Sequence, residues 1–149
     1  MTNKRETLSL LIDLSRRARD SAAAEVAKAV RLESREREMM RKLTRFQDDY
    51  REVSPKRAGQ ATGAQQIETH RLFTDRLDGA VEDQRERESR ATEAREQSEV
   101  ALSLTERRIK ALERLQQKKA LAQRRRDEQR AQRITDEQAA LLARRSRSR

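Results

Sequence analysis

Hydrophobic residues recur at alternating intervals of three and four along the first third of the chain. This spacing is typical of an α-helix that packs along one stripe against another helix. Eleven of the fourteen stripe positions are apolar or aromatic, which favours a helix over a disordered chain. The stripe comprises Leu8, Leu11, Ser15, Ala18, Ala22, Glu25, Ala29, Leu32, Glu36, Met39, Leu43, Phe46, Tyr50 and Val53. We therefore expect a first helix over about residues 5–52.

The only proline and two of the three glycines fall within residues 53–64. Pro55 cannot donate an intrahelical hydrogen bond and disfavours a helical conformation at the residue before it, while Gly59 and Gly63 favour turns. This segment predicts a hinge centred near residue 60. A weaker stripe then predicts a second helix over about residues 65–143, followed by a frayed basic tail at 144–149. Its positions are Ile67, Leu77, Val81, Ala91, Leu102, Ile109 and Leu112.

If the chain folds back near residue 60, the two stripes face each other. The numbers of two facing residues then add up to about 120. The expected pairs include Leu43 with Leu77, Leu11 with Ile109, Leu8 with Leu112, Glu25 with Arg95 and Glu36 with Gln84. We therefore predict an all-α fold, a two-helix antiparallel coiled-coil hairpin with a longer, basic second helix. Residues 1–149 are expected to form this hairpin as a single unit, and residues after about Leu115 have no partner within it.

The composition agrees with this fold. Of the 149 residues, 34% are hydrophobic, 2% aromatic and 42% charged, whereas a compact globule ordinarily has about 45–50% apolar residues. The net charge is uneven, because residues 117–149 carry 11 Lys and Arg against 4 Asp and Glu, a net of +7, while residues 1–116 carry a net of +3. This basic end indicates an acidic protein surface, nucleic acid or anionic lipid as partner.

Catalytic and metal chemistry is poorly supported. The chain has no cysteine, and its one histidine, His70, lacks both a nucleophile and further ligands at metal-binding spacing. We therefore expect a protein that is not an enzyme, uses no cofactor and binds no metal. No stretch approaches the roughly 20 apolar residues of a membrane span, or a signal-peptide core. The expected compartment is the cytoplasm.

Runs of Lys and Arg in the basic end leave a nucleic-acid interpretation open, because such runs bind phosphates without regard to sequence. The segment has no aromatic residue to stack on bases, however, and its apolar cluster is too small for strong membrane anchoring. A protein-binding or solvated arm is favoured, so no nucleic acid is expected as a partner.

The three aromatic residues, Phe46, Tyr50 and Phe73, bracket the hinge. On the hairpin Phe46 and Phe73 face each other, with Leu43 and Leu77 one turn away. Such a cluster either locks the end of the coiled coil or forms a binding hot spot, since aromatic residues dominate both. The residues alone do not decide between these two roles.

Two segments beside the hinge, residues 43–51 (LTRFQDDYR) and 73–84 (FTDRLDGAVEDQ), resemble those of the FliJ family of the bacterial flagellar export apparatus. The first resembles the family's leucine–aromatic–aromatic segment, and the second its Phe-x3-Leu-x2-Ala-x3-His segment. Gln84 stands where the family pattern has histidine, and Phe46 replaces a tyrosine. The resemblance extends to chain length, hairpin layout, the longer second helix and the basic C-terminal end.

The resemblance implies that these segments contact FlhA, the membrane protein of the export gate. Carried over by position, the gate-binding residues are Leu43, Phe46, Tyr50, Phe73, Leu77, Ala80 and Gln84. Family members are also similar in shape to the central stalk of rotary ATP synthases, which implies that the opposite end enters the ring of the export ATPase FliI. Candidate residues for that contact are Arg16, Arg17, Lys118, Lys119, Arg124, Arg125 and Arg126.

The resemblance further implies FliH and unloaded export chaperones as partners, and a location at the cytoplasmic face of the inner membrane. The expected function is thus a stalk of flagellar type III protein export that supports flagellum assembly and motility. Two alternatives stay open, the equivalent stalk of a non-flagellar type III secretion system and a basic coiled coil that binds nucleic acid.

Overall fold

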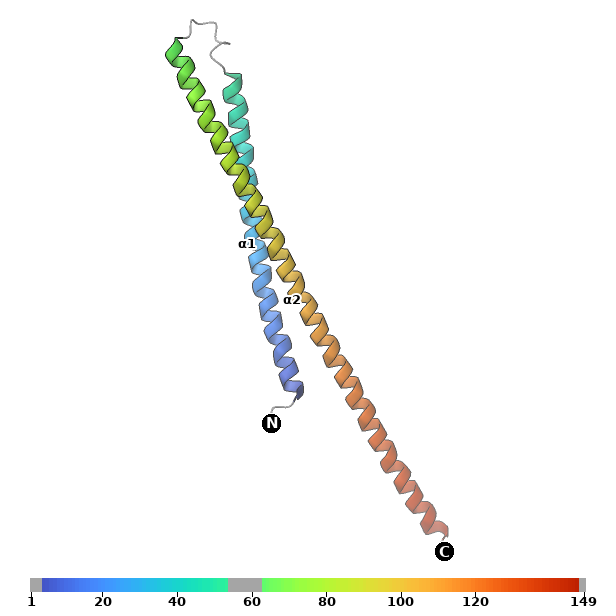
Figure 1. The fold of residues 1–149 in the computed structure, drawn as a ribbon. Helices are drawn as coiled ribbons and strands as arrows, with labels where there is room; N and C mark the ends of the chain where they lie inside the picture. Colours follow the sequence, from blue (N-terminus) through green and yellow to red (C-terminus); the bar gives the residue numbers. More distant parts are fainter. Residues whose placement is uncertain (1–3, 54–62, 148–149) are drawn as a thin grey trace. The chain divides into compact units, whose positions relative to one another are not determined.

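The computed structural model describes residues 4–53 and 63–147, and it forms two α-helices there (Figure 1). Helix α1 spans Lys4–Glu52 and helix α2 spans Ala64–Arg147. The two helices pack against each other, which confirms the prediction of an all-α antiparallel hairpin. Most of the predicted hinge, residues 54–62, lies outside the described residues, as do residues 148–149. Helix α2 continues to Arg147, four residues past the predicted end near 143.

Contacts divide the chain into two compact units. The end unit contains Met1–Ala18 and Thr105–Arg149, and the hinge unit contains Arg19–Leu104. Within the end unit, Gln116 of α2 donates a hydrogen bond to the Ser9 hydroxyl of α1 at 3.2 Å. Within the hinge unit, Gln84 donates one to the backbone carbonyl of Glu36 at 3.1 Å. Each unit is therefore an antiparallel pair of helical segments.

Local sequence explains why both helices are so long. Ala, Leu, Arg, Glu, Gln and Lys, which dominate the chain, have the highest helix propensities. Gly79 is the only glycine inside α2, and a glycine there costs about 1 kcal/mol relative to alanine. Gly63 lies just before α2, where its carbonyl accepts backbone hydrogen bonds from Gln66 at 2.9 Å and Ile67 at 3.3 Å.

The seam between the helices follows a strict heptad spacing of four and three. On α1 the least exposed positions, apart from Thr44, are Leu8, Ile12, Ser15, Arg19, Ala22, Val26, Ala29, Glu33, Glu36, Met40, Leu43, Gln47 and Tyr50. On α2 the same spacing gives His70, Thr74, Leu77, Val81, Gln84, Glu88, Ala91, Arg95, Ser98, Leu102, Thr105, Ile109 and Leu112. The seam therefore mixes apolar residues with a polar middle section.

This seam corrects the predicted one at every second position of α1. The predicted positions Leu11, Ala18, Glu25, Leu32, Met39 and Phe46 are exposed, and the residue after each of them lies in the seam instead. Counting apolar residues favoured the wrong series, because the true series contains Arg19, Glu33 and Gln47. Polar residues occupy these places where the facing helix supplies partners for them.

Two expected pairs show the consequence for the register. The predicted pair of Glu36 with Gln84 is present. The predicted pair of Glu25 with Arg95 is wrong, because Arg95 pairs with Glu33 at 2.8 Å while Glu25 pairs with Lys28 of its own helix at 2.9 Å. The predicted end of pairing near Leu115 is also too early, since Gln116 still bonds to Ser9.

The corrected seam makes a testable prediction about two neighbouring residues. Ile12 is 3% exposed and Leu11 is 43% exposed. Ile12→Ala should lower the free energy of unfolding by about 2–3 kcal/mol, because truncating a buried side chain loses burial and leaves a cavity. Leu11→Ala should cost less than about 1 kcal/mol, since much of that side chain is already in water. Urea unfolding followed by circular dichroism measures both, and equal losses would contradict the seam.

Candidate partner-binding surfaces

Four rings from both helices form an aromatic cluster in the hinge unit, comprising Phe46, Tyr50, His70 and Phe73. Tyr50 lies at its centre, with its ring centroid 4.4 Å from that of Phe73 and 4.7 Å from that of His70. The Tyr50 and His70 rings stack at an interplanar angle of 11°. Phe46 packs edge-on against Phe73 at 6.3 Å. Residues on both sides of the hinge are therefore brought together, as the sequence indicated.

Exposure divides the cluster into a base and a surface. Tyr50 and His70 are half-buried in the seam, whereas Phe46 is 51% exposed and Phe73 is 38% exposed. The rings thus occupy two kinds of position. Tyr50 and His70 pack between the helices, while Phe46 and Phe73 leave ring surface exposed.

His70 carries one unusual atom. Its Nε2 is buried and has no hydrogen-bond partner among the residues that the structure describes. The stacked Tyr50 ring offers contact to the imidazole face but no acceptor to this nitrogen. His70 therefore packs in the seam through its ring contact with Tyr50.

The other predicted gate-binding residues are placed differently. Leu77 and Gln84 are buried in the seam, Leu43 is half-buried, and Ala80 is exposed. The Gln84 amide donates to both the backbone carbonyl and the side-chain carboxylate of Glu36. Leu77 and Gln84 therefore support the surface from below, and Ala80 joins Phe46 and Phe73 at the surface.

A buried carboxylate lies farther along the same unit. Glu33 is 4% exposed, and its two oxygens bond with Arg37 at 2.7 Å, Arg95 at 2.8 Å and the hydroxyl of Thr92 at 3.0 Å. A hydrogen bond to Glu99, and after it the negative charge of Glu33, raises the pKa of the Arg95 guanidinium against the opposing effect of desolvation. Arg95 therefore stays charged, and Glu33 has the partners that a buried charge requires. The predicted stripe, which was chosen by its number of apolar positions, did not include this layer of polar residues.

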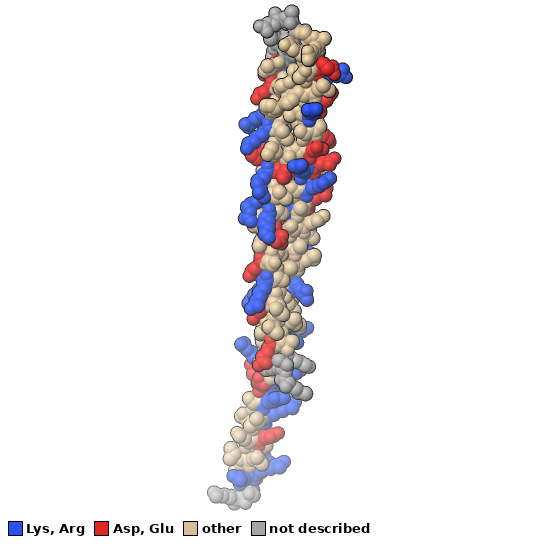
Figure 2. All heavy atoms as spheres, turned by 90° about the vertical axis from the view of Figure 1, so that its left-hand side faces the viewer, with Lys and Arg blue, Asp and Glu red and all other residues tan. Residues whose placement is uncertain are grey.

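The candidate ATPase-binding residues all belong to the end unit. Arg16 pairs with Glu113 of α2 at 2.9 Å and with Asp13 at 3.8 Å. Arg17 and the α2 cations Lys118, Lys119, Arg124, Arg125 and Arg126 are exposed. Figure 2 shows that basic side chains alternate with acidic ones along the visible face, with uncharged surface between them.

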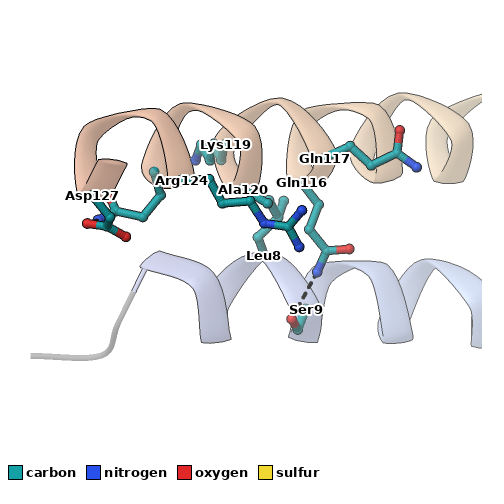
Figure 3. A pocket seen from close by; sticks show the side chains of 9 residues that line it. Leu8, Ser9, Gln116, Gln117, Lys119, Ala120, Arg124 and Asp127 are labelled. Atoms are coloured by element: carbon teal, nitrogen blue, oxygen red, sulfur yellow. Dashed lines mark hydrogen bonds between the residues drawn. The ribbon is translucent and has the colours of Figure 1, made fainter. Parts of the chain in front are cut away.

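A shallow groove lies where these cations meet the start of α1. Its lining includes Leu8 and Ser9 from α1 and Gln116, Lys119 and Arg124 from α2. Figure 3 shows Leu8 pointing toward α2 beside the hydrogen bond between Gln116 and Ser9. The groove thus combines the apolar side chains of Leu8 and Ala120 with the cations Lys119 and Arg124 and the carboxylate of Asp127. Pairing of α1 with α2 extends at least to this point.

Residues 4–53 and 63–147 contain no group of three or more His, Cys, Asp or Glu side chains that could hold a metal ion. Neither described helix has a stretch long and apolar enough to cross a membrane.

Comparison with known proteins gives one positive result. Searches of curated proteins and of solved structures gave no match. The family model described as "Flagellar FliJ protein" matches residues 4–148, which includes both helices and their connection. Because that match covers nearly the whole chain, the protein belongs to the FliJ family and is a component of the flagellar export apparatus.

Proposed function

We propose that this chain links the export gate to the export ATPase, binding FlhA through the aromatic cluster and FliI through the basic end unit. The observation that carries the proposal is the pair of exposed rings, Phe46 and Phe73, held together at 6.3 Å on a base of seam residues. Exposed aromatic side chains with fixed positions are the usual anchors of protein–protein interfaces, since little conformational entropy is lost when they bind.

In this proposal the gate-binding residues have two roles. Phe46, Phe73 and Ala80 contact FlhA directly, because their side chains are exposed. Leu43, Tyr50, Leu77 and Gln84 fix the positions of those three side chains from within the seam. The histidine of the family pattern is replaced here by a glutamine whose amide nitrogen is bonded to Glu36, so this position supports the interface from within the seam.

The end unit is proposed to bind FliI through positive charge. Arg17, Lys118, Lys119 and the Arg124–Arg126 run are exposed, and Lys119 and Arg124 line the groove at Leu8. Arg16 is already paired with Glu113, so its contribution is to hold α1 beside α2. We further propose FliH and unloaded export chaperones as partners and the cytoplasmic face of the inner membrane as the location.

A charge reversal tests the ATPase contact. Arg124→Glu combined with Arg125→Glu and Arg126→Glu should weaken binding to FliI by at least about tenfold. Reversing these charges lowers both the electrostatic attraction that speeds association and the contact energy in the complex. The matched control is Arg144→Glu with Arg145→Glu and Arg147→Glu, which makes the same charge change in the last turns of α2. Equal losses in the two variants would show a general charge effect and contradict a site at 124–126.

Pull-down experiments test the proposal as a whole. The full chain should retain both FliI and the cytoplasmic domain of FlhA, and failure with both would reject the proposal. The flagellar description of the matching family supports a flagellar system over a non-flagellar secretion system. Retention of FliI and FlhA homologues from a virulence-type secretion system, in preference to the flagellar proteins, would favour the other assignment.

A further inference from the structure

One side of the hinge unit carries a row of exposed apolar residues that the seam does not use. On α1 these residues recur every seven positions, and on α2 they occupy the matching heptad place. The row, called here the apolar flank, comprises Leu32, Met39, Phe46, Phe73 and Ala80, and it ends at Glu25 on α1 and Arg87 on α2, which occupy the next heptad places. Contact between Phe46 and Phe73 shows that the two helices contribute to the same side of the pair.

The opposite side of the hinge unit is polar. There Arg51 bonds to Asp78 at 3.0 Å, and Arg37 lies 3.6 Å from Glu88. Val30 is the single large apolar residue that α1 exposes on that side of the hinge unit, among the described residues. Isolated exposed hydrophobic residues are ordinary, but a contiguous apolar row on one side marks a surface that binds something.

Positive charges border the apolar flank on both helices. The bordering residues are Lys28, Arg35 and Lys42 on α1 and Arg76 and Arg90 on α2, with the carboxylates Asp49 and Asp83 in the same heptad places. With Arg87 and Glu25 at the end of the row, these are six cations against three carboxylates. Lys28, Lys42 and Arg90 pair with carboxylates of their own helices. Arg35, Arg76 and Arg87 form no ion pair with any residue that the structure describes. The flank thus combines an apolar centre with unneutralised cations.

We propose that the apolar flank binds an amphipathic α-helix of a partner protein, with apolar residues at heptad spacing and carboxylates on both sides of them. A helix fits because residues seven apart rise about 10.5 Å, so its anchors match the spacing of Leu32, Met39 and Phe46. A second copy of this chain fits poorly, since two such flanks would bring their bordering cations together.

This inference extends the proposed gate contact. It rests on that proposal for FlhA as the natural partner, whereas the acidic helix follows from the residues of the flank alone. The aromatic cluster is one end of the flank, and Met39 and Leu32 continue the surface away from it. A partner helix that reaches Leu32 would therefore extend about four turns beyond Phe46. Acidic side chains on that helix would meet Arg35 on α1 and Arg87 on α2.

A designed peptide tests the chemistry. The probe is a labelled 28-residue helix with Leu at heptad positions a and d and Glu at positions e and g, and its control carries Lys in place of Glu. The full chain should bind the acidic peptide at least about tenfold more tightly than the basic one, as measured by fluorescence anisotropy. Equal binding of the two peptides would overturn the proposal, as would displacement of the acidic peptide by random duplex DNA.

Two variants locate the site. Leu32→Gln with Met39→Gln should weaken binding of the acidic peptide at least about tenfold, because each change removes an apolar anchor. Val30→Gln is the matched control, since Val30 and Leu32 are both 40% exposed but lie on opposite sides of α1. Val30→Gln should leave the affinity within about twofold, as expected for a residue outside the contact. An equal effect of both changes would overturn the assigned side.

The same variants separate this inference from the proposed gate contact. If Leu32→Gln with Met39→Gln weakens binding of both the peptide and FlhA, the inference and the gate proposal both stand. If the double variant binds FlhA normally while loss of Phe46 and Phe73 abolishes that binding, the gate contact is confined to the aromatic cluster. That result would overturn the longer helical site and leave the gate proposal intact.

Discussion

Replacing both Phe46 and Phe73 with alanine is expected to weaken binding to the cytoplasmic domain of FlhA by at least about a hundredfold. Aromatic anchors at the centre of an interface contribute about 2 kcal/mol or more each, and 1.4 kcal/mol corresponds to a factor of ten. The two losses should not add fully, because the rings contact each other and form one anchor. Isothermal titration calorimetry with the full chain measures the change.

Leu72→Ala is the control for that experiment. Leu72 is 54% exposed and adjacent to Phe73 in sequence, yet its heptad place faces away from the seam and from the apolar flank. It should bind FlhA normally. Circular dichroism should show full helicity in both proteins, because Phe46 and Phe73 lie beside the seam and the seam residues themselves are unchanged. Normal FlhA binding by the double variant would show that the rings are not the anchor.

The second large effect is expected at the buried carboxylate. Arg95→Ala should destabilise the chain more than the loss of an exposed ion pair does, because removing one partner leaves Glu33 buried with its charge only partly compensated. Arg37 and Thr92 still bond to the same carboxylate, so part of the compensation remains. Urea unfolding followed by circular dichroism measures the loss.

Arg85→Ala is the matched control for the buried pair. Arg85 and Glu82 form an ion pair at the same 2.8 Å distance, but both side chains are largely exposed. Losing an exposed pair typically costs about 0.5 kcal/mol, because water and ions already weaken it. If Arg95→Ala and Arg85→Ala destabilise the chain equally, the Glu33 layer contributes no more than an ordinary surface pair.

The two-helix fold could be predicted because several local signals agreed. Helix-forming residues fill both segments, and Pro55 with Gly59 and Gly63 interrupts them only once. The pairing of Glu36 with Gln84 followed correctly from folding the chain at that interruption. Half of the α1 seam positions, including Leu8, were also correct.

The other half of the α1 seam could not be predicted by counting apolar residues. Leu32, Met39 and Phe46 form a better apolar series than the true one, which includes Glu33 and Gln47. Only the facing helix decides the matter, since Arg95 and Thr92 satisfy Glu33 and Asp78 bonds to Gln47. The sequence therefore showed that Leu32, Met39 and Phe46 form an apolar row, but not that this row lies exposed beside the seam.

The candidate binding site was predicted in part for the same reason. The clustering of Phe46, Tyr50 and Phe73 followed from the hairpin, and their rings do contact one another. Which of the three rings is exposed depends on which residues of α1 face α2. The predicted stripe placed every second seam position one residue too early. Burial of Leu77 and Gln84 likewise became visible only with the helices packed.

Site-specific photo-crosslinking tests the central claim most directly. A benzophenone side chain is placed in turn at Phe46, Phe73 and Leu72, and each full-length protein is irradiated with the cytoplasmic domain of FlhA. The exposed face of the aromatic cluster predicts crosslinks from positions 46 and 73 and none from 72. Crosslinks from 72 alone, or none from 46 and 73 while FlhA still binds, would contradict it.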